Sequence, residues 1–66
     1  MEYHLFLIDK DKGTILGQAK GNFPMLPNKG ELVTFYQGKR QLEGLVEERR
    51  FHLGHDRVTI ELYLTV

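Results

Sequence analysis

The last nine residues of the chain alternate strictly between apolar and polar side chains. The apolar positions are Val58, Ile60, Leu62, Leu64 and Val66, and the polar-side positions are Thr59, Glu61, Tyr63 and Thr65. A period of two residues places every second side chain on the same face of a β-strand. A strand with one apolar face must pair with other strands and have that face covered, so residues 58–66 predict a sheet protein.

Four further segments are predicted as strands. Residues 3–8 are apolar at every position except His4, which suits a strand covered on both faces or one packed against a second subunit. Residues 9–13 form a polar cluster that ends in Gly13, typical of a hairpin turn, and residues 14–19 return from it. Gly17 predicts a bulge or a close backbone approach in that second strand. Residues 31–37 form the next strand, and 38–40 a tight turn.

Residues 41–53 fit two structures. Their helical spacing favours a helix near residues 41–51, and this alternative would give an α+β fold. As a strand, the segment places Leu42, Gly44 and Val46 on one face, and a bulge near Glu47 would then bring Phe51 and Leu53 to that face. We predict the long bent strand, because Gly44 and the missing N-cap disfavour a helix.

The chain predicts one small all-β domain over residues 1–66, a five-stranded antiparallel barrel. The segment 21–30 contains two Pro and two Gly, which excludes a helix or a central strand there. With 66 residues and no Cys, no disulfide can compensate for a thin core. The predicted core is Leu5, Leu7, Ile15, Val33, Phe35, Val46, Val58, Ile60, Leu62 and Leu64.

One part of the sequence resembles small barrels of the Src-homology-3-like type. A Pro27-Asn28-Lys29-Gly30-Glu31-Leu32-Val33 segment opens a strand, and Gly44-Leu45-Val46 follows on the next. The similarity extends over residues 23–66. It implies an SH3-like barrel of unassigned function, and peptide-binding members of that type carry a Trp that this chain lacks.

Enzymatic activity is not expected. The chain has no Ser and no Cys, and its four Thr residues have no N-terminal position that a free amine could activate. No Gly-rich segment leads into a helix to cradle a phosphate, so we expect no cofactor. His52, His55 and Asp56 straddle a predicted turn, with His4 as a distant third histidine, and this spacing is more typical of surface histidines than of a metal site.

The prediction is therefore a cytoplasmic binding module whose unknown partner is a protein. Nine basic and nine acidic residues cancel, so no overall field favours nucleic acid. Single-stranded nucleic acid is nevertheless the alternative, because basic residues lie beside aromatic ones in the C-terminal half. The predicted contact residues are Phe23, Met25, Leu26, Tyr36, Arg40, Arg49, Arg50, Phe51 and Tyr63.

Two further expectations concern assembly and membranes. The longest apolar run is only residues 5–8, so no membrane association is predicted. The apolar first and last strands suggest a homodimer in which these terminal strands pair between two copies. Tyr3 and Phe6 are expected to face outward, and the dimer would bury Phe6 together with Tyr63.

Overall fold

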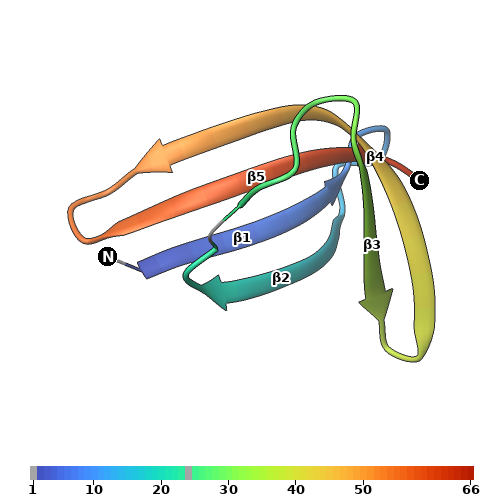
Figure 1. Cartoon of the computed structure of the whole chain (residues 1–66), viewed down its shortest axis with the longest axis horizontal. Coiled ribbons are helices and arrows are strands. Elements are labelled where there is room, and N and C mark those ends of the chain that lie inside the picture. Colours follow the sequence, from blue (N-terminus) through green and yellow to red (C-terminus); the bar gives the residue numbers. More distant parts are fainter. Residues whose placement is uncertain (1, 24) are drawn as a thin grey trace.

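The computed structural model describes residues 2–23 and 25–66, and these form one five-stranded sheet (Figure 1). The described residues contain no helix, which confirms the all-β prediction and excludes the helical alternative for residues 41–51. No segment among them could therefore cross a membrane as a helix. The strands are β1 (Glu2–Asp9), β2 (Ile15–Gly21), β3 (Leu32–Gln37), β4 (Arg40–Leu53) and β5 (Arg57–Thr65).

The sheet is mixed, with strand order β2-β1-β5-β4-β3. Three of its pairs are antiparallel, but β1 and β5 run parallel, so the prediction of a fully antiparallel barrel is wrong at this pair. Hairpin turns predict how neighbouring strands pair, whereas β1 and β5 come from opposite ends of the chain. The segment between β2 and β3 crosses one face of the sheet (Figure 1). The strands β3, β4 and β5 that follow it therefore lie on the side of β1 opposite to β2.

In this topology the terminal strands offer no free edge for the pairing that a homodimer was expected to use. Both β1 and β5 are central strands, and each is paired on both sides within the chain. Their edges are therefore not available to a second copy. Tyr3 also packs against the core instead of facing outward, because it has the same strand parity as Leu5 and Leu7.

The sheet curls into a half-barrel whose outer strands are β2 and β3. The side-chain nitrogen Nε2 of Gln37 donates a hydrogen bond to the Leu16 carbonyl oxygen at 3.3 Å. Among the described residues this contact takes the place of a backbone ladder, since no strand pairing joins β2 to β3. Four strand-to-strand ladders thus form the half-barrel, which remains open between β2 and β3.

A bulge in β4 changes which of its side chains face the core. The register with β5 shifts between Val46 and Glu48, which confirms the bulge predicted near Glu47. Before the shift, Gly44 and Val46 are buried. After it, the residues opposite the core side chains of β5 are Arg49, Phe51 and Leu53, which pair with Leu62, Ile60 and Val58.

We call the core-bearing side of the sheet the inner face and the opposite side the outer face. The buried core on the inner face comprises Leu7, Phe35, Val46, Val58, Ile60, Leu62 and Leu64, all predicted. Leu5 and Val33 were also predicted, and they pack against this cluster while partly buried. The prediction for Ile15 is wrong, since this side chain is 57% exposed.

The misplacement of Ile15 has a local cause. The β1–β2 register shifts between Leu7 and Ile8, so that Ile15 lies opposite Ile8 and Leu16 packs against the core in its place. Ile8, which was not predicted as a core residue, is buried. The shift lies next to Gly17, where the sequence predicted an irregularity.

The segment between β2 and β3 ends as a short extension along β4. Leu26 packs against the core, and Glu31 and Asn28 close a turn through a hydrogen bond from the Asn28 amide to the Glu31 carboxylate. The Gly30 amide then donates to the Val46 carbonyl at 2.8 Å, and the Val46 amide donates to the Glu31 carbonyl at 2.9 Å. Backbone pairing on this side of β4 therefore continues as far as Val46.

Candidate binding surface

The second half of β4 has an unpaired outer edge. The strand β3 pairs with residues 40–45 of β4, and Gly30 and Glu31 extend this pairing to Val46. Beyond that point no described residue pairs with β4 on the side away from β5 (Figure 1). We call residues 48–53, seen from this side, the free edge of β4.

The inner-face side chains of the free edge are two exposed apolar residues and one arginine. Phe51 is 48% exposed and Leu53 is 83% exposed, although they lie opposite the buried Ile60 and Val58. The guanidinium carbon of Arg49 lies 5.6 Å from the centroid of the Phe51 ring, within the range of a cation–π contact. The apolar inner face therefore extends to the free edge of β4, where Phe51 and Leu53 are left uncovered.

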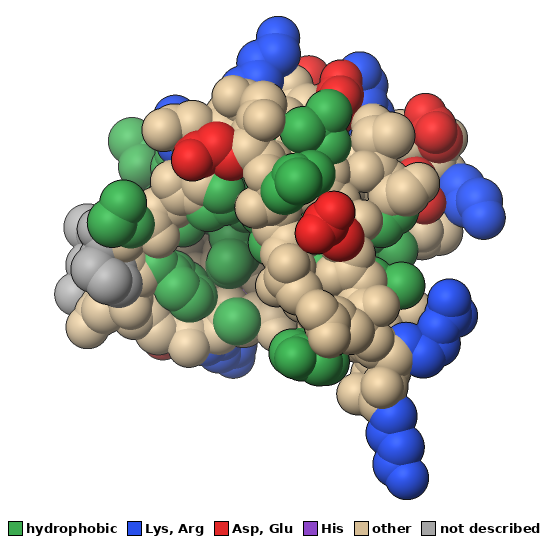
Figure 2. Space-filling view, turned by 45° about the vertical axis from the view of Figure 1, so that its right-hand side comes forward, with side chains coloured by type: hydrophobic (Ala, Val, Ile, Leu, Met, Phe, Trp, Pro, Cys, Tyr) green, Lys and Arg blue, Asp and Glu red, His purple; other side chains and the backbone are tan. Residues whose placement is uncertain are grey.

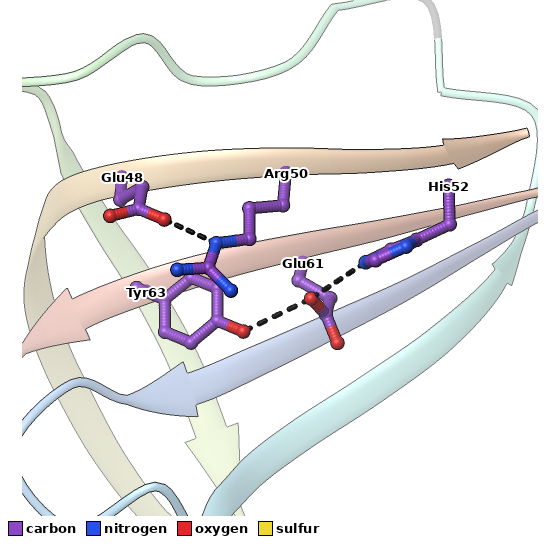
Figure 3. A network of polar contacts seen from close by, with 5 residues as sticks. All are labelled: Glu48, Arg50, His52, Glu61 and Tyr63. Atoms are coloured by element: carbon purple, nitrogen blue, oxygen red, sulfur yellow. Dashed lines mark hydrogen bonds and ion pairs between the residues drawn. The ribbon is translucent and has the colours of Figure 1, made fainter.

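On the outer face, the same stretch of β4 joins a polar network with β5 (Figure 3). Arg50 forms an ion pair with Glu48, and its guanidinium carbon lies 4.9 Å from the centroid of the Tyr63 ring. The Tyr63 hydroxyl donates to Glu61 Oε1 at 3.0 Å. The same oxygen lies 2.9 Å from Nε2 of His52, which must carry a hydrogen to donate this bond.

These contacts shift the pKa values of three groups. The hydrogen bond from His52 lowers the pKa of the Glu61 carboxyl, because it stabilises the carboxylate. Donation to that carboxylate raises the pKa of the Tyr63 hydroxyl, since ionisation would place two negative charges together. The hydrogen bond to Glu48 raises the pKa of Arg50. The outer face of β4 is thus a set of mutually satisfied charges.

A second group on the outer face was not anticipated from the sequence. The rings of His4 and Phe6 on β1 lie 4.3 Å apart between centroids, at 35° to each other. Nε2 of His4 is 3.2 Å from the side-chain oxygen of Gln18 on β2. Alternation in residues 3–8 is hidden by their nearly continuous apolar character, so the sequence offered only the two-residue spacing of these rings as evidence.

The predicted contact residues do not form one surface. Arg49 and Phe51 lie on the inner face, whereas Arg50 and Tyr63 lie on the outer face. Tyr36, which is 69% exposed, and Arg40 lie at the β3–β4 hairpin. In the connection between β2 and β3, Phe23 is half-buried, Met25 is 85% exposed and Leu26 packs inward, while Pro24 lies outside the described residues.

Two other kinds of site find no support in the described part of the chain. It encloses no pocket and holds no group of three or more acidic, His or Cys side chains arranged to bind a metal. His52 is directed at Glu61, whereas His55 and Asp56 lie in the turn between β4 and β5. In the view of Figure 2, apolar side chains form separate patches and the Lys and Arg side chains project at the periphery.

The fold and this surface together define a class: a small all-β, barrel-like domain with one curled, mixed sheet and an uncovered strand edge. Searches against family models, curated proteins and solved structures found no match for the chain. Any functional proposal therefore depends on the geometry of the surface itself.

Proposed function

We propose that this protein is an interaction module that binds an extended segment of a partner protein as an added strand along the free edge of β4. The observation that supports it is the coincidence of unpaired backbone with two exposed apolar side chains, Phe51 and Leu53. An added strand gains affinity from backbone hydrogen bonds and specificity from contacts with alternate side chains. Exposed strand edges are otherwise covered or blunted in proteins.

The charged residues of the free edge make such binding selective. Glu48, Arg49 and Arg50 stand next to one another on the strand, and charged side chains at an edge discourage indiscriminate pairing. A partner strand must match these charges to bind, because like charges directly opposite each other are destabilising. The edge is therefore suited to a particular partner more than to general aggregation.

The alternative function, binding of single-stranded nucleic acid, has less support. Such binding uses a positively charged groove with several exposed aromatic faces in succession, whereas Arg49 beside Phe51 on the inner face is a single such pair. On the outer face, Arg50 covers the Tyr63 ring and is itself paired with Glu48, and Glu61 adds a further carboxylate. A phosphate backbone would have to displace these contacts against two negative charges.

We further propose that the half-barrel is related to the Src-homology-3-like type. It is supported by the five-strand composition and by the match of the Pro27–Val33 segment to the start of β3. The parallel pairing of β1 with β5 departs from the fully antiparallel barrel expected from that resemblance. The proposed binding mode depends on the free edge of β4 and not on this relationship.

Selection of short peptides from a random display library, followed by NMR titration of labelled protein, tests the proposed function. We expect selected peptides to shift the backbone resonances of residues 48–53 and to slow hydrogen exchange of amides there. Leu53→Asp should abolish binding while leaving the rest of the spectrum unchanged. Leu32→Asp is a matched control, because Leu32 is also exposed, at 62%, but lies on β3.

The same protein should be titrated with labelled oligonucleotides at two salt concentrations. Peptides that bind away from β4, or that bind the Leu53→Asp variant unchanged, would refute the proposed mode. Tight binding of single strands that weakens steeply with salt and is lost in Arg50→Ala would instead support the nucleic-acid alternative.

A further inference from the structure

We infer that the segment bound at the free edge of β4 places one carboxylate opposite Arg49 and apolar side chains opposite Phe51 and Leu53. This inference rests on the proposed function and concerns the chemistry of the partner. It follows from the different surroundings of the two neighbouring arginines.

Arg49 differs from Arg50 in having no acidic partner. Within residues 2–23 and 25–66, side-chain ion pairs join Lys10 to Glu47, Arg50 to Glu48 and His52 to Glu61, but none involves Arg49. The Arg49 guanidinium lies beside the Phe51 ring, a contact that leaves its N–H donors available. A carboxylate brought to this position would gain an ion pair that the isolated protein does not make.

Strand geometry fixes the spacing of the side chains that would contact this face. Arg49, Phe51 and Leu53 follow at intervals of two residues, so an added strand faces them with every second side chain. Directly opposite side chains have Cβ atoms about 4.5–5.5 Å apart. A parallel segment would carry one acidic residue followed at two-residue intervals by two apolar residues, and an antiparallel segment would carry the same residues in the reverse order.

The intervening side chains of the partner contribute less to the specificity of binding. They would face the outer side, where Glu48, Arg50 and His52 are already engaged with each other or with β5. Small polar residues that suit a strand, such as Thr, satisfy these positions. Recognition is thus concentrated on the inner side.

A second copy of this chain fits the edge poorly. Its own inner-face side chains at the free edge are Arg49, Phe51 and Leu53, and none of them can offer a carboxylate to Arg49. In an antiparallel pairing centred on residue 49 or on residue 50, that arginine would lie directly opposite its own copy, which is unfavourable. The charges of the edge therefore favour a different, acidic chain.

The test compares three synthetic peptides by isothermal titration and NMR. In the first, one Glu is followed at alternate positions by Val and Leu with Thr between them, and the others carry Gln or Lys in place of Glu. Each of the three is also made with its sequence reversed, which presents the same side chains from an antiparallel segment. We expect the Glu peptide to bind about tenfold more tightly than the Gln peptide, as a new charge-assisted hydrogen bond would give. The Lys peptide should bind least.

Variants of the protein assign this preference to one side chain. Arg49→Gln should remove the difference between the Glu and Gln peptides, and Arg49→Glu should make the Lys peptide the tightest. Arg50→Gln is the matched control, since the side chain faces the other side of the sheet, and the preference should persist.

The outcomes separate this inference from the proposed function. If library-selected or synthetic peptides shift residues 48–53 but show no preference for the acidic residue, the inference about charge is wrong and strand addition stands. If neither the selected nor the synthetic peptides perturb residues 48–53, strand addition itself is refuted. A protein mass of two chains in light scattering, with the free-edge amides protected without any peptide, would show that a second copy is the occupant.

Discussion

Replacing Gly44 by Ala measures how closely β4 packs against β5 in the core. Gly44 is buried, and a Cβ atom built on it would lie 3.0 Å from both Cβ and Cδ1 of Leu64 and 3.5 Å from its Cγ. Carbon atoms in contact prefer separations of about 3.5–4.0 Å. Leu64 is fully buried, so it has little freedom to move away. The cost is steric, because Gly44 is not among the glycines with positive φ.

The expected loss can be estimated from two opposing effects. Overpacking a core costs about 1–3 kcal/mol, whereas replacing Gly by Ala restricts the unfolded chain and returns about 0.4–1 kcal/mol. We therefore expect Gly44→Ala to lower the free energy of unfolding by about 1–2 kcal/mol. Leu64→Ala should cost more, about 2–5 kcal/mol, from lost burial and the cavity left behind. Both fall within the roughly 3–10 kcal/mol that a 66-residue domain has in total.

The two substitutions should be strongly coupled. In a Leu64→Ala background, the contacts of the new Cβ with Cγ and Cδ1 no longer exist, so Gly44→Ala should cost less there by about 1 kcal/mol. Urea denaturation followed by circular dichroism gives all four free energies. Gly17→Ala is the control, since its Cβ would lie 3.7 Å from Leu7 Cδ1, an ordinary contact. A neutral Gly44→Ala, or equal losses in both backgrounds, would refute the close packing described here.

Three further predictions concern the register of β2, the β1–β2 turn and the contact between His52 and Glu61, and denaturation measures the first two. Ile15→Thr should change the free energy of unfolding by less than about 0.5 kcal/mol because the side chain is exposed, whereas Leu16→Ala should cost more; the reverse order would contradict the register of β2. Gly13→Ala should cost about 1–2 kcal/mol, since Gly13 has φ near 70° in the β1–β2 turn, and no loss would mean that the turn adapts. The lowered pKa of Glu61 should stabilise the fold above the ordinary glutamate range and lose this contribution as the pH falls through the folded-state value. His52→Phe should raise the Glu61 pKa observed by NMR, and an unchanged value would exclude His52 as the main cause.

Local pattern was sufficient to predict the strands of this protein but not how they assemble. Alternation in residues 58–66 and the turn at Gly13 each depend on neighbours a few residues apart, and β5 and the β1–β2 hairpin follow from them. The parallel pairing of β1 with β5 joins residues more than fifty positions apart, such as Tyr3 and Val58. Nothing in either segment specifies its partner.

The contact residues were selected by residue type, and the structure shows that they do not share one face of the sheet. Arg49, Arg50, Phe51 and Tyr63 were all selected as contact residues, but grouping them as one surface ignored that neighbours on a strand face opposite sides. The exposure of Leu53 was also unforeseen, because it depends on β3 ending its pairing before this part of β4. An unpaired edge is a property of the topology, which no local spacing of residues reveals.

The bulge at Glu47 connects the core of this protein to its proposed binding surface. Without the extra residue, the alternation that buries Gly44 and Val46 would continue to Glu48, Arg50 and His52 on the inner face. Phe51 and Leu53 would then be directed outward beside Glu61 and Tyr63, and three polar side chains would face the apolar row of β5. With the bulge, the polar side chains meet their partners on the outer face, and the apolar pair continues the core to an edge where it remains uncovered. One additional residue thus both satisfies the charges of β4 and produces the mixed arginine and apolar surface on which the proposed partner would lie.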